Sequence, residues 1–187
     1  MNEPDALRCA AFLIAAFVGA GILHVLWMGS PSSRYFAVPL DFGRTIRGRR
    51  LFGDNKTFRG FVVMTPAAAA AFVLLSKVFG GLWPISAPQY AALGVCSGLG
   101  FMLGELPNSF LKRQLGVPPG QAPTNPTARL VCLLIDRTDS IAGMLVALRL
   151  LVPVPWQTWI YVLVSGAGIH GIFSFLLYRL GVKGRAL

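Results

Sequence analysis

The chain has 187 residues, a length that fits one domain, and 55% of them are hydrophobic whereas only 13% are charged. Soluble domains average about 45–50% apolar and about 25% charged residues, so this composition excludes a disordered chain and argues against an ordinary soluble globule. Basic residues number 17 and acidic residues seven, and the resulting net charge of +10 favours an anionic partner.

Long uncharged stretches predict membrane-spanning helices, because runs of more than about 18 apolar residues are typical of such helices. We expect five spans, at residues 9–28, 60–79, 89–104, 130–151 and 156–180. The fourth contains Asp136, Arg137 and Asp139, and a span that tolerates such charges usually turns them towards the bundle interior or a water-filled cavity. The predicted fold is an all-α integral membrane protein, a bundle of about five transmembrane helices with two functional cytoplasmic loops. We expect residues 1–187 to form one membrane-embedded domain.

Basic residues fall in alternate connections between the expected spans. The connection at 30–59 holds seven lysines and arginines, the one at 80–88 holds none, the one at 105–129 holds three, and the one at 153–155 holds none. The C-terminal segment is again basic. Under the positive-inside rule this alternation predicts a protein of the cytoplasmic membrane with its N-terminus outside and its C-terminus inside.

Acidic residues in the expected spans are candidates for a functional site. Asp136 and Asp139 stand three residues apart, so on a helix their carboxylates share one face. One interpretation is a charge cluster neutralised by Arg137 and another base. The other is functional, because ionisable groups within spans usually mark functional sites and paired carboxylates offer the hard oxygen ligands that suit Mg²⁺ brought in with a nucleotide. Glu105, at the cytoplasmic end of the third span, is a further candidate ligand.

A second group of polar residues follows Glu105, in the sequence Ser109-x-x-Lys112-Arg113. On a helix this spacing puts the hydroxyl and the two bases within one turn of each other. Lys112 and Arg113 alone would indicate a topology anchor. Next to three acids they indicate a site for phosphate groups, which Arg113 can bind in a bidentate manner.

The first basic connection contains the segment 48–60, which reads GRRLFGDNKTFRG. Glycines that allow unusual backbone angles, interleaved with bases, can bring N–H groups and cations close to phosphates. The alternative is a polybasic patch on anionic lipid, in which each base contributes about 1 kcal/mol near the surface. We slightly favour the phosphate site, because a lipid patch does not need Gly-Asp-Asn-Lys-Thr between its arginines.

These motifs resemble those of a known family. Segment 48–60 resembles the hallmark loop of CDP-archaeol synthases, which couple CTP to an ether-linked lipid phosphate, and Ser109-x-x-Lys112-Arg113 and Asp136-Arg137-x-Asp139-Ser140 resemble the signature of the related phosphatidate cytidylyltransferases. The resemblance covers about residues 30–151. It implies five spans, Mg²⁺ held by carboxylates, and attack of the lipid phosphate on the α-phosphorus of CTP with release of pyrophosphate. The family usually has aspartate at the position of Glu105.

The resulting hypothesis is a Mg²⁺-dependent CTP:lipid-phosphate cytidylyltransferase of phospholipid biosynthesis, with CTP, a lipid phosphate and the bilayer as partners. The expected metal ligands are Glu105, Asp136 and Asp139. The expected catalytic cations that bind the phosphates are Lys56, Arg59, Lys112 and Arg113, with further hydrogen bonds from Asn55, Thr57 and Ser109. The alternatives are a small transporter or channel that uses the two aspartates as a cation site, and a relative that binds nucleotide or lipid without turnover. No pattern indicates nucleic-acid binding, and the sequence leaves open whether the protein is an oligomer.

Overall fold

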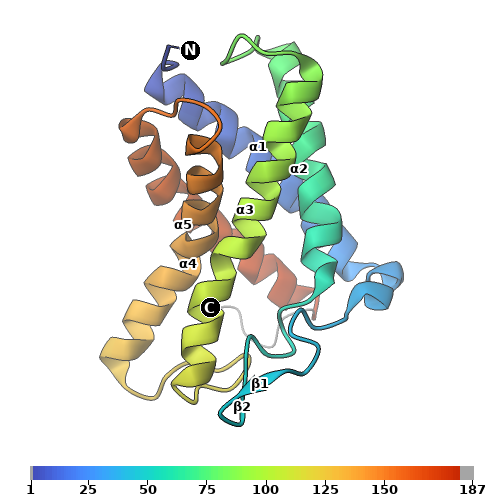
Figure 1. The fold of residues 1–187 in the computed structure, drawn as a ribbon, viewed down its shortest axis with the longest axis vertical. Coiled ribbons are helices and arrows are strands. Elements are labelled where there is room, and N and C mark those ends of the chain that lie inside the picture. The colour runs from blue at the N-terminus through green and yellow to red at the C-terminus, as the bar shows by residue number, and fades with distance from the viewer. Residues whose placement is uncertain (1, 182–187) are drawn as a thin grey trace.

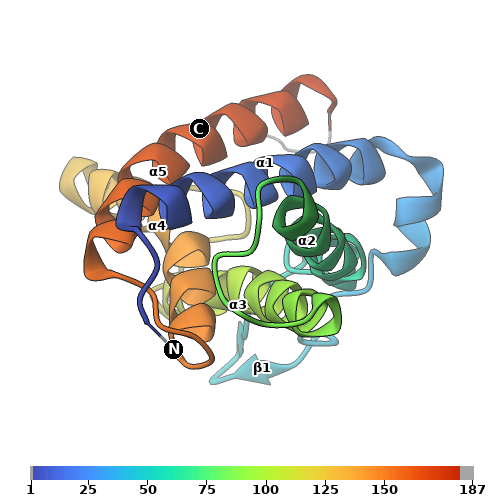
Figure 2. The ribbon, with the colours of Figure 1, turned by 90° about the horizontal axis from the view of Figure 1, so that it is seen from above.

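The computed structural model describes residues 2–181, whose helices are arranged in a ring (Figure 1). The ring consists of α1 (Ala6–Gly29), α2 (Phe58–Val78), α3 (Ala87–Gln114), α4 (Pro126–Arg149) and α5 (Trp156–Arg179). Each helix packs against its neighbours in the chain, and α5 packs back onto α1 (Figure 2). A hydrogen bond from Thr158 Oγ1 to the carbonyl oxygen of Ala6, 3.0 Å long, helps to close the ring.

The helices lie at all five predicted positions, and the predicted all-helical membrane architecture is confirmed at this level. Of the helices in the described residues, α1, α2 and α5 are both long and apolar enough to cross a membrane. Helices α3 and α4 carry the charged motifs and do not meet that standard, so the full count of five spans stays a prediction. Helix α3 also continues beyond its expected end at residue 104 to Gln114, and this extension carries the Ser-x-x-Lys-Arg motif.

Small residues let α3 pack closely against both of its neighbours. A Cβ atom on Gly94 would lie 2.5 Å from the Cα of Ala69 on α2. Gly104 of α3 and Gly143 of α4 likewise leave no room for a side chain between the two facing backbones. Glycine at such positions allows membrane helices to approach each other closely. These contacts fix the position of the polar end of α3 relative to α4.

The apolar core fills the half of the ring next to the N-terminus. Phe12 packs edge-on against Phe72, with ring centroids 5.2 Å apart. The indole nitrogen of the buried Trp83 donates a hydrogen bond of 3.0 Å to the carbonyl oxygen of Pro153 and so joins two connections at that end. The other half of the ring holds the cavity.

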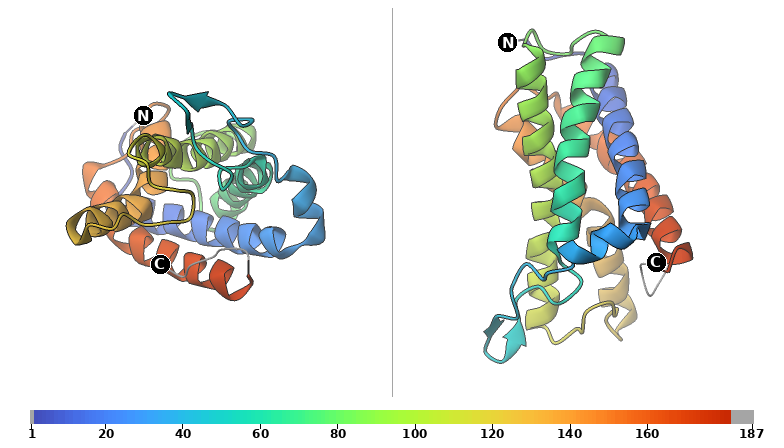
Figure 3. Two further views of the ribbon diagram at one scale, coloured as in Figure 1. Left: turned by 90° about the horizontal axis from the view of Figure 1, so that it is seen from below. Right: turned by 90° about the vertical axis from the view of Figure 1, so that its right-hand side faces the viewer.

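The connection between α1 and α2 is more structured than the sequence indicated. It contains a 3₁₀ helix, η1 (Pro31–Phe36), and a short antiparallel hairpin of β1 (Thr45–Ile46) and β2 (Arg49–Arg50). Arg47 and Gly48 form its turn with φ of 52° and 75°, as expected for a two-residue hairpin loop. The hairpin and the α3–α4 connection lie at one end of the molecule, whereas the N-terminus and the other two connections lie at the opposite end (Figures 1 and 3). The basic connections therefore share one end, which supports the predicted topology.

Candidate active site

A cavity of about 900 Å³ lies between the helices, on the side of the molecule that carries the hairpin. One of its walls is mainly apolar and includes Phe17 of α1 and Phe173 and Leu177 of α5. The same two helices also contribute three polar side chains to the lining, those of His24, His170 and Ser174. The opposite wall is polar and comes from the segment before α2, from α3 and from α4. The cavity brings together every site residue that the sequence predicted, namely Asn55, Lys56, Thr57, Arg59, Glu105, Ser109, Lys112, Arg113, Asp136 and Asp139.

Asn108 of α3 links the two aspartates of α4. Its Nδ2 atom donates hydrogen bonds to Asp136 Oδ1 at 2.5 Å and to Asp139 Oδ2 at 3.1 Å. Ser140 makes the next connection, since its hydroxyl donates to Glu105 Oε1 at 2.8 Å. Asn108 is not among the predicted site residues, because an uncharged amide in a polar segment stands out only by its place next to Ser109.

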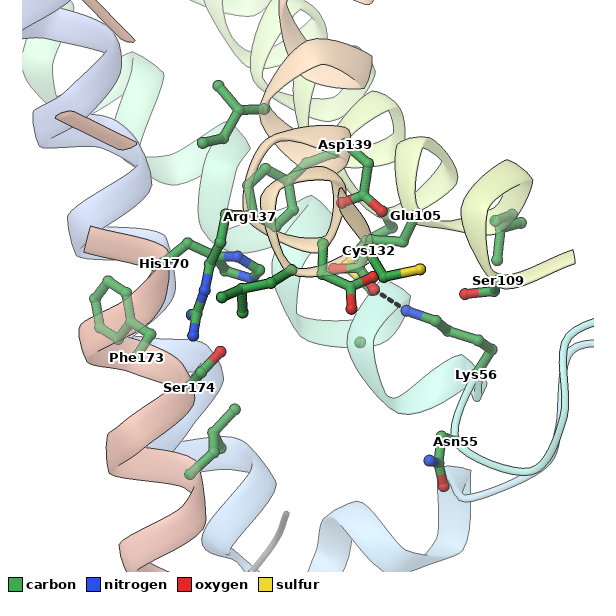
Figure 4. A pocket seen from close by; sticks show the side chains of 18 of the residues that line it. Asn55, Lys56, Glu105, Ser109, Cys132, Arg137, Asp139, His170, Phe173 and Ser174 are labelled. Carbon is green, nitrogen blue, oxygen red and sulfur yellow. Dashed lines mark hydrogen bonds and ion pairs between the residues drawn. The ribbon is translucent and has the colours of Figure 1, made fainter. Parts of the chain in front are cut away.

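Two lysines form ion pairs with the acids. Lys56 pairs with Glu105 (Figure 4), and Lys112 pairs with Asp136. Burial acts to lower the pKa of the Lys56 ammonium, but Glu105 outweighs this effect and raises that pKa above its ordinary value. The interpretation in which Arg137 and another base neutralise the aspartates is wrong for Arg137, which forms no ion pair with a described residue. Lys112 is the base that pairs with Asp136.

Of the arginines that line the cavity, Arg113 and Arg59 have different surroundings. The side chain of Arg113 is buried, with the residue 8% exposed, and its Nε and Nη1 atoms have no hydrogen-bond partner among the described residues. A buried guanidinium without acceptors is costly, so this position favours an anionic ligand. Arg59 instead binds the end of α1, donating from Nη2 to the Met28 carbonyl at 3.2 Å and to Ser33 Oγ at 2.9 Å.

Asp41 organises the segment that leads to α2. Its carboxylate is buried and accepts hydrogen bonds from the backbone N–H groups of Gly43, Phe52 and Gly53, each 3.0 Å long, and from the guanidinium of Arg50. Burial alone would raise the pKa of Asp41, but Arg50 and the three N–H groups hold it well below its usual range. The sequence analysis missed this residue, whose partners become clear only once the hairpin is formed.

The two basic connections meet at Gly53. This residue has φ of +90°, and a Cβ atom there would lie 2.8 Å from Cγ of Pro119 in the α3–α4 connection. Pro119 and Gly120 line the cavity together with Asn55 and Lys56. The rim of the cavity at this end is therefore built from both connections.

The oxygen donors of the site suit a hard cation. Mg²⁺ is commonly bound through one or two carboxylates together with substrate phosphates, and Asp136 and Asp139 offer such a pair beside Asn108. Within residues 2–181, no three His, Cys, Asp or Glu side chains converge on one metal position. Glu105 contacts Lys56 and Ser140 instead. The oxygen chemistry of the aspartate pair fits the ion, and the roles of Asp136, Asp139 and Glu105 as metal ligands stay predictions.

Comparison with known proteins places these features in context. The pattern of the CarS-like family, described as CDP-archaeol synthase, matches residues 36–186. The CDP-archaeol synthase of Saccharolobus solfataricus is 29% identical over 181 residues, which cover 96% of this chain and 95% of that protein. The enzyme of the same name from Sulfolobus acidocaldarius is 30% identical over 148 residues, covering 78% of this chain and 80% of its own. The fold is similar to a solved intramembrane enzyme for archaeal membrane lipids biosynthesis, with a TM-score of 0.59, 25% identity, and coverage of 81% of this chain and 88% of that one.

Proposed function

Because this chain belongs to the CarS-like family of CDP-archaeol synthases, which are CTP-dependent lipid cytidylyltransferases, we propose that it transfers the cytidylyl group of CTP to the phosphate of a membrane lipid. The observation that carries this proposal is that one cavity has a wall of cationic and acidic side chains and, facing it, a mainly apolar wall. Such a cavity suits a charged nucleotide and an amphiphilic lipid at the same time. The packed core beyond it argues against a transporter, which needs a polar path through both halves of the bundle.

The reaction needs positioning and charge neutralisation more than acid–base chemistry. An oxygen of the lipid phosphate forms a bond to the α-phosphorus of CTP. The bond from that phosphorus to the oxygen bridging to the β-phosphate breaks, and pyrophosphate leaves with the electron pair. The attacking phosphate is already ionised near neutral pH, so no side chain has to remove a proton from it.

The cations of the polar wall bind the phosphates in this proposal. Arg113 is buried without acceptors, and Lys56 and Lys112 are held beside the acids by their ion pairs. Positive charge fixed in a cavity of low dielectric stabilises the charge that builds up on the leaving pyrophosphate. The smaller polar groups Asn55, Thr57 and Ser109 line the same wall and add hydrogen bonds.

We propose that the site uses Mg²⁺, with Asp136 and Asp139 as its protein ligands and Glu105 as a further one. When bound, the ion supplies positive charge to the triphosphate. Asn108 holds the two aspartates next to each other through its shared hydrogen bonds. The lysines that now neutralise the acids are also within reach of ligands in the cavity, because both line it.

A turnover assay tests the proposed function. Purified protein is incubated with labelled CTP, Mg²⁺ and an ether-linked dialkylglycerol phosphate, with an ester-linked lipid phosphate and the dialkylglycerol without phosphate in parallel. We expect a CDP-lipid and one pyrophosphate per product molecule from at least one lipid phosphate, and no product from the alcohol. CTP binding without formation of any CDP-lipid would indicate that the protein is a family member that binds the nucleotide but does not catalyse the transfer. Cation flux through proteoliposomes without CTP would favour the transporter.

A further inference from the structure

Arg137 lies between the two aspartates in the sequence, but its side chain points away from their carboxylates (Figure 4). It follows Asp136 on α4 and lines the cavity. Figure 4 shows its guanidinium on the α5 side, towards Phe173 and Ser174, whereas Lys56 reaches Glu105 from the opposite side. The guanidinium is only partly exposed and makes no hydrogen bond or ion pair with a residue in the described part of the chain.

The helical geometry explains this direction. Successive residues of an α-helix are rotated by about 100°, so Arg137 cannot share the face on which Asp136 and Asp139 meet Asn108. The facing position on α5 is Gly171, where a Cβ atom would lie 3.4 Å from Nη1 of Arg137. The guanidinium therefore lies against α5 at Gly171, at van der Waals distance from the position of that Cβ atom.

The cations of the cavity are thereby divided between two sides. Most of them come from the rim side of the cavity, where the basic connections meet. These are Lys56 before α2, Arg59 at the start of α2, Lys112 and Arg113 on α3, and Arg129 at the start of α4. Arg137 instead lies against α5 at Gly171, on the side of the cavity that carries Phe173, His170 and Ser174 (Figure 4). The reaction has two anionic substrates, and only one of them, the lipid, carries chains that an apolar wall can hold.

We propose that Arg137 binds the phosphate of the lipid substrate, and that the nucleotide phosphates are bound by the cations of the opposite side. This assignment rests on the proposed function and adds a substrate-binding residue to it. A guanidinium offers a planar fork that binds two phosphate oxygens at once and leaves the third free to attack. In this arrangement Arg137 binds the lipid phosphate between α4 and α5. Asp136 and Asp139 lie on the neighbouring face of α4, where the metal and the nucleotide bind in our proposal.

Substitution of Arg137 separates the binding of the two substrates. R137Q should raise the KM for dialkylglycerol phosphate by roughly tenfold or more, since a charge-assisted bidentate contact is lost, while the dissociation constant for CTP stays within about twofold. R137K keeps the charge without the fork and should fall between wild type and R137Q. R149Q is the matched control, because Arg149 is an exposed arginine in the last turn of the same helix. It should change neither constant.

Direct binding makes the test independent of turnover. Detergent-solubilised wild type should bind dialkylglycerol phosphate more tightly than the dialkylglycerol without phosphate, and R137Q should lose this preference. Equal affinity of wild type for the two lipids overturns the assignment of Arg137, even where CDP-lipid is formed. An R137Q or R137K protein that loses CTP binding to the same extent as lipid binding also overturns it. Absence of CDP-lipid from wild type, together with a phosphate preference that depends on Arg137, overturns the proposed reaction alone.

Discussion

At the scale of single residues, Asp136 and Asp139 share one amide group, that of Asn108. We predict that Asp136→Asn and Asp139→Asn each abolish CTP turnover and leave the protein folded, because each removes a charged ligand from a site where a metal positions the triphosphate. Turnover is measured at saturating Mg²⁺, with Glu3→Gln as a control that removes an exposed acid far from the cavity. Near-normal turnover of either variant would show that the aspartate it replaces is not a required metal ligand.

Glu105 occupies a position at which the family that the motifs resemble usually has aspartate. Glu105→Gln should lower turnover severely because it removes the charge that faces Lys56 and Ser140, whereas Glu105→Asp should retain substantial activity. Loss of a metal ligand can cost several kcal/mol of transition-state stabilisation, and each 1.36 kcal/mol is about tenfold in rate.

Turnover and melting temperature are measured on the same Glu105 preparations. A purely structural Glu105 would give a lower melting temperature in both variants with little change in turnover per folded molecule. Full activity of Glu105→Gln would leave the two aspartates alone to hold the metal.

Charged residues of the site could be predicted because charge is rare in this chain. Asp136, Lys112 and Glu105 stand out against apolar sequence, and all of them line the cavity. Asn108 and Asp41 could not be found in this way. Asn108 is uncharged and so does not stand out in the sequence. Asp41 accepts hydrogen bonds from backbone groups near a hairpin that no sequence pattern predicts.

At the scale of elements, the hairpin depends on Asp41. We predict that Asp41→Asn lowers the free energy of unfolding by about 1–3 kcal/mol at pH 7, because it removes the charge that Arg50 and three N–H groups stabilise. Asp54→Asn is the matched control: Asp54 also pairs with Arg50, but its side chain is 70% exposed, so we expect a loss of about 0–1 kcal/mol.

The pH dependence of this effect has a defined sign. The pKa of Asp41 is lower in the folded protein than in the unfolded chain, so its stabilisation is complete above about pH 4 and is lost as the pH falls towards the folded value. Thermal unfolding of wild type and Asp41→Asn at a series of pH values should therefore show a constant difference from pH 7 to pH 5 that shrinks only in more acidic solution. A difference that grows on acidification would contradict this account.

The uncharged runs predicted where the five helices lie, but they did not predict where every helix ends. The extension of α3 contains Pro107, which has no backbone N–H and usually ends or kinks a helix, and it also contains the charges of the site. Both features argue for a loop when they are taken from the sequence alone. Packing of α3 against α4 keeps the segment helical in spite of them. Strands of two residues, as in the hairpin, are too short to show an alternating pattern.

At the scale of the whole molecule, the basic connections lie together at the end opposite the N-terminus (Figure 1). We predict that this end faces the cytoplasm. In a variant whose native cysteines are replaced by serine, Ser86→Cys should react with an impermeant reagent added outside intact cells, and Arg47→Cys should react only after the cells are opened. Labelling of Arg47→Cys in intact cells, without labelling of Ser86→Cys, would show that the protein has the opposite topology.

The closure of the ring between α1 and α5 has a consequence for biosynthesis. A chain that has emerged from the ribosome only as far as α4 already carries the acids and lysines of the polar wall, but the helix that faces Arg137 and completes the apolar wall is still missing. The contact that completes the cavity joins α1 and α5, which lie far apart in the sequence, as the bond from Thr158 to Ala6 illustrates. Contacts of such long range form late, because the loop that they close is long. The nascent protein therefore cannot form the complete cavity until α5 has entered the membrane and packed against α1.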